Sequence, residues 1–415
     1  MIFRILHFLL LFIGFSIGLV NGQIDQVSVG EGYSNQAYYS LSTGEVTVLS
    51  NEAWDIAFTN QGGTDAGILI NESSTSGSEA IGLFLTAETD WNVEIVDEGQ
   101  FPDSIKIYNS EQNWSEGAFN SVKDTSSVLD FGWGLYNPSN HVIEGNRIFV
   151  IKKRDGVLLK FQVESLSSGT YTFKYAHLDG SNEQVKTVSK NSELDNSLIL
   201  FSLNTGETLD MPTDFDLIFQ RYTTDLDAGD GTIIPYTVTG VLSGPGVEVA
   251  KAEGVDPENV LEADYADQYS NSLTAIGHDW KGFDFALGWV IPDDRAYFVK
   301  NSKGEKYKIV FYDFEGSSTG TTTLEKTVLL SSAISTIDNS NIDIKVYPNP
   351  FTHSVIVSTG SDNDAEVQLY DIEGKLLLSK NFNRQIKLET ENLISGQYLL
   401  KISQDDHFIT KQIIK

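Results

Sequence analysis

The stretch NEAWDIAF, residues 51–58, returns in altered form as PTDFDLIF, residues 212–219. Successive side chains of a β-strand point to opposite faces of its sheet. This alternation places Trp54, Ile56 and Phe58 on one face, and the second stretch repeats the same apolar row. Large apolar side chains on one face favour burial. We therefore predict that each stretch is a strand that faces the core of its own folding unit.

Each stretch also holds one acid, Asp55 or Asp216, on the face opposite the apolar row. A short carboxylate next to a turn commonly accepts hydrogen bonds from backbone N–H groups. We expect both carboxylates to accept such bonds from the glycine-rich turn that follows them. They are interpreted as structural residues and not as a site.

Three further pairs of stretches repeat in the same order along the chain. They are YSLSTGE (39–45) with FSLNTGE (201–207), FVIKKRDGVLLKFQV (149–163) with FVKNSKGEKYKIVF (298–311), and SGTYTFK (168–174) with TGTTTLE (319–325). Collinear matches of this kind indicate a duplicated unit. We predict two tandem modules, residues 23–190 and 191–332, and the second module can take its first strand from about 198–203.

The composition favours an all-β fold. The chain contains 35 glycines and few runs of helical periodicity, which is typical of short strands joined by turns. Alternating segments predict hairpins at 147–163 and 296–312, and Asp155-Gly156 suits the tight turn of the first. One short helix is expected within residues 256–273.

The bulk properties restrict the class of protein. The 415 residues are 40% apolar, which is enough for two or three folded units, and they include no cysteine, so disulfides and thiolate metal sites are excluded. A net charge of −30 disfavours nucleic acid and anionic lipid as partners. Residues 1–22 have the pattern of a signal peptide, and no other stretch has the length of a membrane span. We expect an exported protein without a transmembrane helix in its mature form.

The C-terminal residues predict a third unit, a small immunoglobulin-like β-sandwich at 342–415, after a polar linker at 333–341. Its motifs are YPNP (347–350), LYDIEGKLL (369–377), GQYLLKI (396–402) and the terminal Lys415. In these motifs it resembles the type A sorting domain of the type IX secretion system of Bacteroidetes. The resemblance implies passage through the type IX machinery, removal of this domain, and a product that is attached to the cell surface or released.

The two upstream modules resemble the HmuY family of haemophore-like proteins from the same bacterial group. The residues that carry the resemblance are YSLSTGEVTVLSNEAWDIAF (39–58) and NQGGTDAG (60–67) in the first copy, and DFDLIFQRYTT (214–224), YTVTGVL (236–242), IGHDWKGF (276–283) and YFVKNSKGEKYKIVFYDFEGSSTG (297–320) in the second. The resemblance implies an almost entirely β fold. For the best-known members it also implies capture of haem between two side-chain ligands, but the motifs align no ligand pair in this chain.

Haem iron is held by His, Met, Cys or Tyr side chains within an apolar slot. The candidate ligands in the mature chain are His141, His177, His278 and Met211. His278 is the preferred candidate, because Trp280 and Phe283 stand close to it in the sequence and can form a stacking wall. A hydrogen-bonded loop residue is the alternative for each histidine.

Calcium is a second candidate ligand. Residues 225–231, DLDAGDG, bring together Asp225, Asp227 and Asp230, whose oxygens suit Ca²⁺. The segment lacks the spacing of an EF-hand and its closing Glu, so a plain turn between strands is the alternative.

No motif of a nucleophile elbow, zinc protease or P-loop is present, so we expect no enzymatic activity, and a hydrolase ranks last. The function expected from the sequence is capture of a small hydrophobic ligand such as haem by a secreted or outer-membrane surface protein. The alternative is a non-haem surface interaction protein, an adhesin or glycan-binding module, that uses exposed aromatic side chains such as Trp91, Trp114 and Trp133.

Overall fold

The computed structural model divides into two compact units, Met1–Leu329 and Leu330–Lys415, which are described separately. It describes residues 22–62, 65–96, 99–191, 197–329, 344–359, 363–371, 375–404 and 407–415. Nearly all of the predicted signal peptide and the predicted linker 333–341 lie outside these residues. Within the described residues, strands make up 49% and no helix reaches 7 residues, so the all-β prediction is confirmed.

Four antiparallel sheets form the larger unit. Sheet A contains, in spatial order, β1 (Gln23–Ser28), β22 (Thr321–Leu329), β21 (Lys306–Phe314), β20 (Arg295–Lys300) and β17 (Glu248–Glu253). Sheet B contains β16 (Ile233–Ser243), β15 (Leu217–Asp227), β2 (Asn35–Tyr39) and β3 (Val46–Ser50). Sheet C contains β14 (Glu207–Asp210), β13 (Leu198–Ser202), β4 (Ile56–Thr59) and β5 (Ile68–Ile70). Sheet D contains β12 (Gln184–Ser189), β11 (Thr170–His177), β10 (Leu158–Ser167), β8 (Val142–Gly145) and β7 (Gly134–Asn137), with β9 (Phe149–Lys152) joining β6 (Gly82–Leu85) to β10.

The remaining elements of this unit are short. They are the hairpin β18 (Gly282–Asp284) and β19 (Gly288–Val290), and the 3-10 turns η1 (Glu31–Tyr33), η2 (Asp103–Ile105), η3 (Ala118–Asn120), η4 (Glu262–Tyr265) and η5 (Gly316–Ser318). The predicted hairpins at 147–163 and 296–312 are confirmed as β9–β10 and β20–β21. The helix predicted within 256–273 is wrong, because that segment holds only η4 and packs Tyr265 and Tyr269 against the outer face of sheet A.

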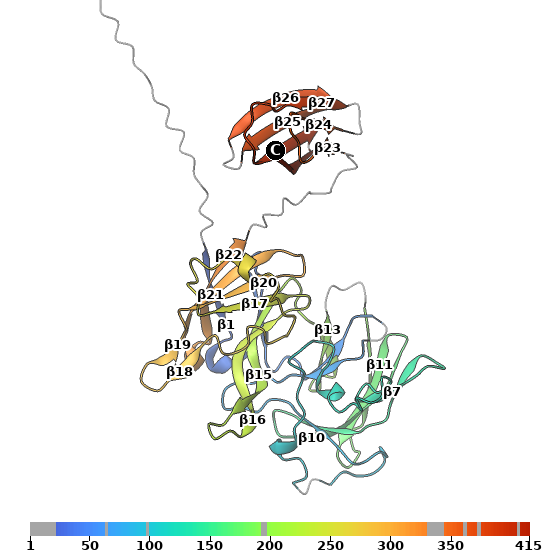
Figure 1. Ribbon diagram of the computed structural model, residues 1–415. Coiled ribbons are helices and arrows are strands. Elements are labelled where there is room, and N and C mark those ends of the chain that lie inside the picture. Colours follow the sequence, from blue (N-terminus) through green and yellow to red (C-terminus); the bar gives the residue numbers. More distant parts are fainter. Residues whose placement is uncertain are drawn as a thin grey trace, which may run out of the picture. The chain divides into compact units, whose positions relative to one another are not determined.

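The four sheets are stacked in the order A, B, C, D. One apolar core lies between sheets A and B, and a second lies between sheets C and D. A third, which we call the central core, lies between sheets B and C. In Figure 1, β15 and β16 accordingly run between the orange strands of sheet A and the green strands of sheet D. Sheets B and C are therefore buried on both faces, unlike a sandwich sheet that has one face in water.

Strands of the two predicted modules pair with each other in sheets B and C. In sheet B, β2 of the first predicted module pairs with β15 of the second, with Tyr39 opposite Leu217. In sheet C, β13 of the second pairs with β4 of the first, with Phe201 opposite Ile56. Sheets B and C therefore each contain strands from both sides of the boundary predicted at 190/191, which stays a prediction. The A–B core draws on residues 27–41 and 217–324, and the C–D core on 56–203.

Asp55 and Asp216 stabilise this pairing by hydrogen bonds. Asp55 Oδ2 accepts the backbone N–H of Leu203 at 2.7 Å, and Asp216 Oδ2 accepts that of Leu41 at 2.7 Å. Leu203 directly precedes the turn NTGE (204–207) and Leu41 directly precedes the turn STGE (42–45), so each donor belongs to the other predicted module. The carboxylates therefore accept backbone N–H groups as expected, but from a residue before a turn of the other predicted module and not from the turn that follows them. Burial raises the pKa of both groups, and the hydrogen bonds oppose this rise.

Within each strand the predicted apolar row faces one core, but the aromatic residue predicted to begin the row faces another core. Ile56 and Phe58 enter the C–D core, whereas Trp54 lies in the central core. The second copy behaves alike, since Leu217 enters the A–B core and Phe215 packs on the central core. The reason is that each strand begins only after its acid, so the alternation does not extend back to the first aromatic residue.

The C-terminal unit is a small sandwich of two sheets. One sheet contains β23 (Lys345–Tyr347), β24 (Ser354–Ser358) and β27 (Gln385–Glu389). The other contains β26 (Leu376–Asn383), β25 (Asp364–Asp371), β28 (Gln397–Gln404) and β29 (His407–Ile414). Val355, Val367 and Leu400 are among the residues that fill the core between them. The prediction of a β-sandwich is thus confirmed.

Replacing Asp216 by alanine should lower the free energy of unfolding by about 1–3 kcal/mol, because the buried Leu41 N–H loses its acceptor. Asp216→Asn keeps an oxygen there and should lose less. The exposed Asp210 gives the control Asp210→Ala, with a change within about 0.5 kcal/mol. Urea unfolding followed by tryptophan fluorescence measures all three, and equal losses in the two alanine variants would contradict the role given to Asp216.

Candidate functional site

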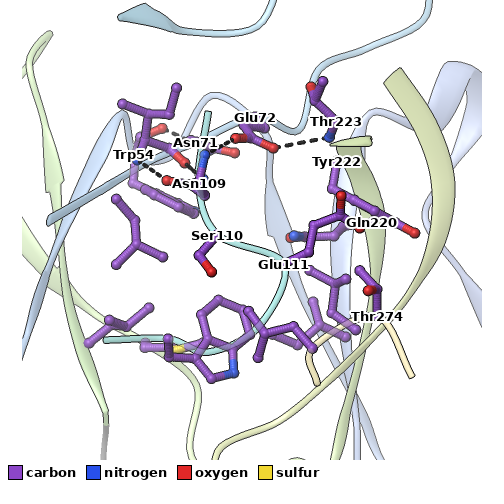
Figure 2. Close-up of a pocket in the computed structure, with 18 of the residues that line it drawn as sticks. Trp54, Asn71, Glu72, Asn109, Ser110, Glu111, Gln220, Tyr222, Thr223 and Thr274 are labelled. Carbon is purple, nitrogen blue, oxygen red and sulfur yellow. Dashed lines mark hydrogen bonds between the residues drawn. The ribbon is translucent and has the colours of Figure 1, made fainter. Parts of the chain in front are cut away.

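A pocket opens within the central core, between sheets B and C (Figure 2). Its apolar walls are formed by Tyr38, Trp54, Leu69, Ile70, Trp114, Leu198, Leu200, Met211, Ile218, Tyr222, Leu242 and Leu273. Its polar lining consists of Asn71, Glu72, Asn109, Ser110, Glu111, Gln220, Thr223 and Thr274. The cavity has a volume of about 40 Å³, which is room for a few water molecules. An apolar cavity with a few convergent polar groups is the usual form of a ligand site.

A buried hydrogen-bond network holds the aromatic wall on the side of Trp54. The Oε1 atom of Gln36 accepts from Tyr38 Oη at 3.1 Å and from Trp54 Nε1 at 3.0 Å, while its Nε2 donates to Asn71 at 2.9 Å. Asn71 in turn donates to the carbonyls of Asn51 and Trp54. Satisfied networks of this kind fix side-chain orientation. The aromatic wall is therefore set before any ligand binds.

Glu72 joins the two halves of the pocket from a fully buried position. Its Oε1 accepts the backbone N–H of Asn109 at 2.7 Å and its Oε2 accepts that of Thr223 on β15 at 3.0 Å (Figure 2). Burial raises the pKa of Glu72 to about 7, the two hydrogen bonds oppose this rise, and the charge of Glu111 adds to it. No sequence motif identifies Glu72, because a lone acid after a short strand has no distinguishing pattern.

Loops from the two halves close the mouth of the pocket. The carbonyl of Glu111 accepts Leu273 N–H and Ser272 Oγ–H, each at 3.0 Å. Trp114 Nε1 donates to the carbonyl of Ser243 at 3.0 Å. Segment 109–114 of the first copy is thereby tied to segment 272–274 of the second. Glu111 and Thr274 are half-buried, which places them at the rim.

The three histidines predicted as haem ligands lie on different elements, and none lines the central pocket. His141 is exposed after β7, where its Nδ1 lies 2.6 Å from Tyr136 Oη. His177 ends β11 and lines a separate surface hollow. His278 lies 3.4 Å from Tyr222 Oη, behind the pocket wall, and burial lowers its pKa. Met211 is the one candidate ligand of the four that the pocket contains.

The aromatic residues predicted to stack near His278 do not form one wall. Trp280 is buried in the A–B core against Phe311, with ring centroids 4.3 Å apart. Phe283 instead extends into solvent on β18. The two residues diverge because Trp280 precedes the hairpin and Phe283 is part of it.

The tryptophans proposed as an exposed glycan surface are also placed differently from the prediction. Trp133 is fully buried in the C–D core, and Trp114 lines the central pocket. Trp91 is half-buried, with the ammonium groups of Lys160 and Lys174 each 4.7 Å from its ring centre. These three side chains form no common surface patch.

The acidic loop proposed for calcium is the turn between β15 and β16. Asp227 Oδ1 accepts the N–H groups of Gly229 and Gly231, and Asp230 Oδ1 accepts that of Thr232. Across the described ranges of the chain, no three His, Asp or Glu side chains are placed to hold a metal ion. Calcium binding by Asp225, Asp227 and Asp230 therefore stays a prediction without a formed site.

The stability of the chain should depend on the protonation of Glu72. Its pKa in the folded chain, about 7, lies above the ordinary 4.5, so the stabilisation is fully present below pH 4.5 and is lost as the pH rises through 7. Its size is on the order of 3 kcal/mol. The glutamine in Glu72→Gln is uncharged at every pH. The free energy of unfolding of this variant, relative to that of wild type, should therefore rise by about 3 kcal/mol between pH 5 and pH 8.

Chemical unfolding of both proteins at the two pH values measures that difference. Glu111 and Tyr108 are the titratable neighbours of Glu72, and both are present in each protein. The exposed Glu88 supplies the control Glu88→Gln, which should follow wild type at both pH values. A Glu72→Gln profile parallel to that of wild type would contradict the raised pKa.

Two family models match the chain. One, described as HmuY protein, matches residues 32–175, and one described as Secretion system C-terminal sorting domain matches residues 345–415. No curated protein matches it. The HmuY match covers the first copy, so the resemblance of the second copy stays a prediction.

Within the described residues, no helix is long and apolar enough to cross a membrane. The two domains indicate a secreted or cell-surface protein. The chain carries an HmuY domain followed by a type IX secretion sorting domain.

Proposed function

We propose that this protein, after export, captures a small ligand in the central pocket and does not catalyse a reaction. The observation that carries the proposal is an enclosed aromatic cavity whose walls come from both copies of the repeat. Burial of apolar ligand surface supplies affinity in such a cavity, and the few polar groups supply orientation. The sorting domain implies export through the type IX machinery, and we propose that it is removed afterwards.

Haem is the first ligand to test, because the HmuY family is associated with it. Met211, Tyr38 and Tyr222 offer side-chain types that can ligate haem iron. The cavity of about 40 Å³ is nevertheless far smaller than the roughly 300 Å³ of ordinary ligand pockets. A porphyrin does not fit the pocket in this conformation, and room for one requires segments 109–114 and 272–274 to separate.

If the pocket binds haem, adding the protein to haemin should change the Soret absorbance. This change should require Met211 and none of the three histidines. Replacing His141, His177 and His278 together by alanine should leave the change intact, because none of them lines the pocket. Met211→Leu should abolish it. A change lost in the triple variant would place haem elsewhere, and absence of any change in wild type would exclude haem while leaving small-ligand capture open to other probes.

A second candidate function is binding of a glycan surface, as in an adhesin. The hairpin β18–β19 projects from the larger unit (Figure 1) and exposes apolar side chains. They are Phe283 (57% exposed), Phe285 (99%), Leu287 (79%) and Trp289 (38%). Exposed apolar patches commonly mark interaction sites, and flat aromatic rings can stack on the apolar faces of sugars.

The base of this hairpin is held firmly. The buried Lys281 ammonium lies 4.5 Å from the ring centre of Trp280, 5.5 Å from that of Trp289 and 4.7 Å from that of Phe314. Its Nζ also donates to the carbonyl of Thr239. A fixed base presents the exposed tip in one orientation, which favours recognition over random contact.

If the hairpin binds glycans, the double variant Phe285→Ser, Leu287→Ser should lose binding on a glycan array without loss of thermal stability, because both side chains extend into solvent. Val128→Ser, at a position 93% exposed and outside the hairpin, is the control. Binding that persists in the double variant would exclude the hairpin as the contact surface.

A further inference from the structure

Among the described residues that line the central pocket, none is Lys, Arg or His, while Glu72 and Glu111 both contribute carboxylates. His278 lies behind the wall beside Tyr222 and interacts electrostatically with Glu111, but burial lowers its pKa and favours the neutral imidazole. The nearest basic side chain on β15, Arg221, is directed away and donates to Ser74. A buried carboxylate without a charged partner is unfavourable, so a cation of suitable size would complete the site.

The two carboxylates still have capacity to accept hydrogen bonds. Each oxygen of Glu72 accepts one backbone N–H, while a carboxylate oxygen can accept two. Glu111 Oε1 accepts Thr224 Oγ1–H at 2.9 Å, and its Oε2 has no protein partner in the described part of the chain. The amide of Gln220, also in the lining, has no side-chain partner there either. The site can therefore accept several hydrogen bonds from a ligand.

Much of the remaining lining is aromatic. Tyr38, Trp54, Trp114 and Tyr222 all line the cavity. The face of an aromatic ring attracts a cation, and the attraction grows where water is excluded. Aromatic rings combined with carboxylates are the usual recognition chemistry for organic ammonium groups.

We propose that the central pocket binds a small organic cation, with an ammonium group directed at Glu72 and Glu111 and an apolar body against the aromatic wall. This inference rests on the proposed function of ligand capture and specifies the chemical class of the ligand. The cavity of about 40 Å³ has room for an ammonium head only, so seating the apolar body requires segments 109–114 and 272–274 to separate. The two propionates of haem carry the wrong charge for the same surface.

Binding of a cation is linked to the proton on Glu72. With a pKa of about 7, Glu72 is mostly neutral at pH 6 and mostly ionised at pH 8. A permanent cation should therefore bind about tenfold more tightly at pH 8. Glu111 and Tyr108 are the titratable groups nearest to Glu72, so their variants belong in the same series.

The test uses the full mature chain and two probes of nearly equal shape, choline and its neutral carbon analogue 3,3-dimethylbutan-1-ol. Calorimetric titration at pH 8 should show choline binding at least tenfold more tightly than the alcohol. Glu111→Gln should weaken choline by about tenfold or more, as expected for loss of a charged partner. Because Glu111 is half-buried at the rim, this variant should fold normally, which thermal unfolding checks.

Two further variants locate the binding. Thr274→Trp fills the mouth of the pocket and should abolish choline binding, whereas the exposed-surface variant Glu88→Gln should leave it unchanged. Glu72→Gln should remove the pH dependence. Equal affinity for both probes would overturn the cation inference but keep ligand capture in the pocket. Binding of neither probe, or choline binding unaffected by Thr274→Trp, would also overturn it, and the haemin titration then decides ligand capture separately.

Discussion

The larger unit depends on one arrangement, the pairing of strands from the two predicted modules within sheets B and C. The hairpin around STGE (42–45) pairs with β15, the hairpin around NTGE (204–207) pairs with β4, and a buried carboxylate accepts a backbone N–H of each hairpin. This pairing places both repeated strands in the middle of a stack, so that each must bury two faces. The chain contains no cysteine, and this reciprocal pairing takes the place of a covalent link between the copies.

The same arrangement explains why a pocket exists. Equivalent positions of the two copies face each other across the central core, but their side chains differ in size. Tyr38 of the first copy corresponds to Leu200 of the second, and Ala57 corresponds to Ile218. Interiors pack closely only where shapes are complementary. The facing side chains of the two predicted modules differ in size, and they leave space between sheets B and C that residues of one module alone do not enclose.

The sequence was sufficient for the fold class, the hairpins and the sorting domain, because periodicity and turn residues act locally. It could not show which predicted module each strand pairs with, since nearly the same phrase ends β2 and β13 and continues into the turn, and either partner satisfies the pattern. The site was missed for a related reason. Glu72, Glu111 and Met211 are far apart in the chain and no motif joins them, whereas none of the three candidate histidines lines the pocket. The alternation of apolar residues predicts which face of a strand is buried, but only the strand pairing in the structure shows which buried faces lie against each other.

The position of Glu72 links ligand binding to the contact between the two sides of the pocket. Its carboxylate accepts N–H groups from segment 109–114 on one side and from β15 on the other. When Glu72 is protonated, one of its oxygens becomes a donor and accepts fewer hydrogen bonds. Ionisation of Glu72 therefore favours its two backbone hydrogen bonds, whereas burial disfavours the charge. A bound cation resolves this conflict, because it compensates the charge and leaves both acceptors in place. A ligand of that class would therefore strengthen the contact between the two copies at the same point where it is held.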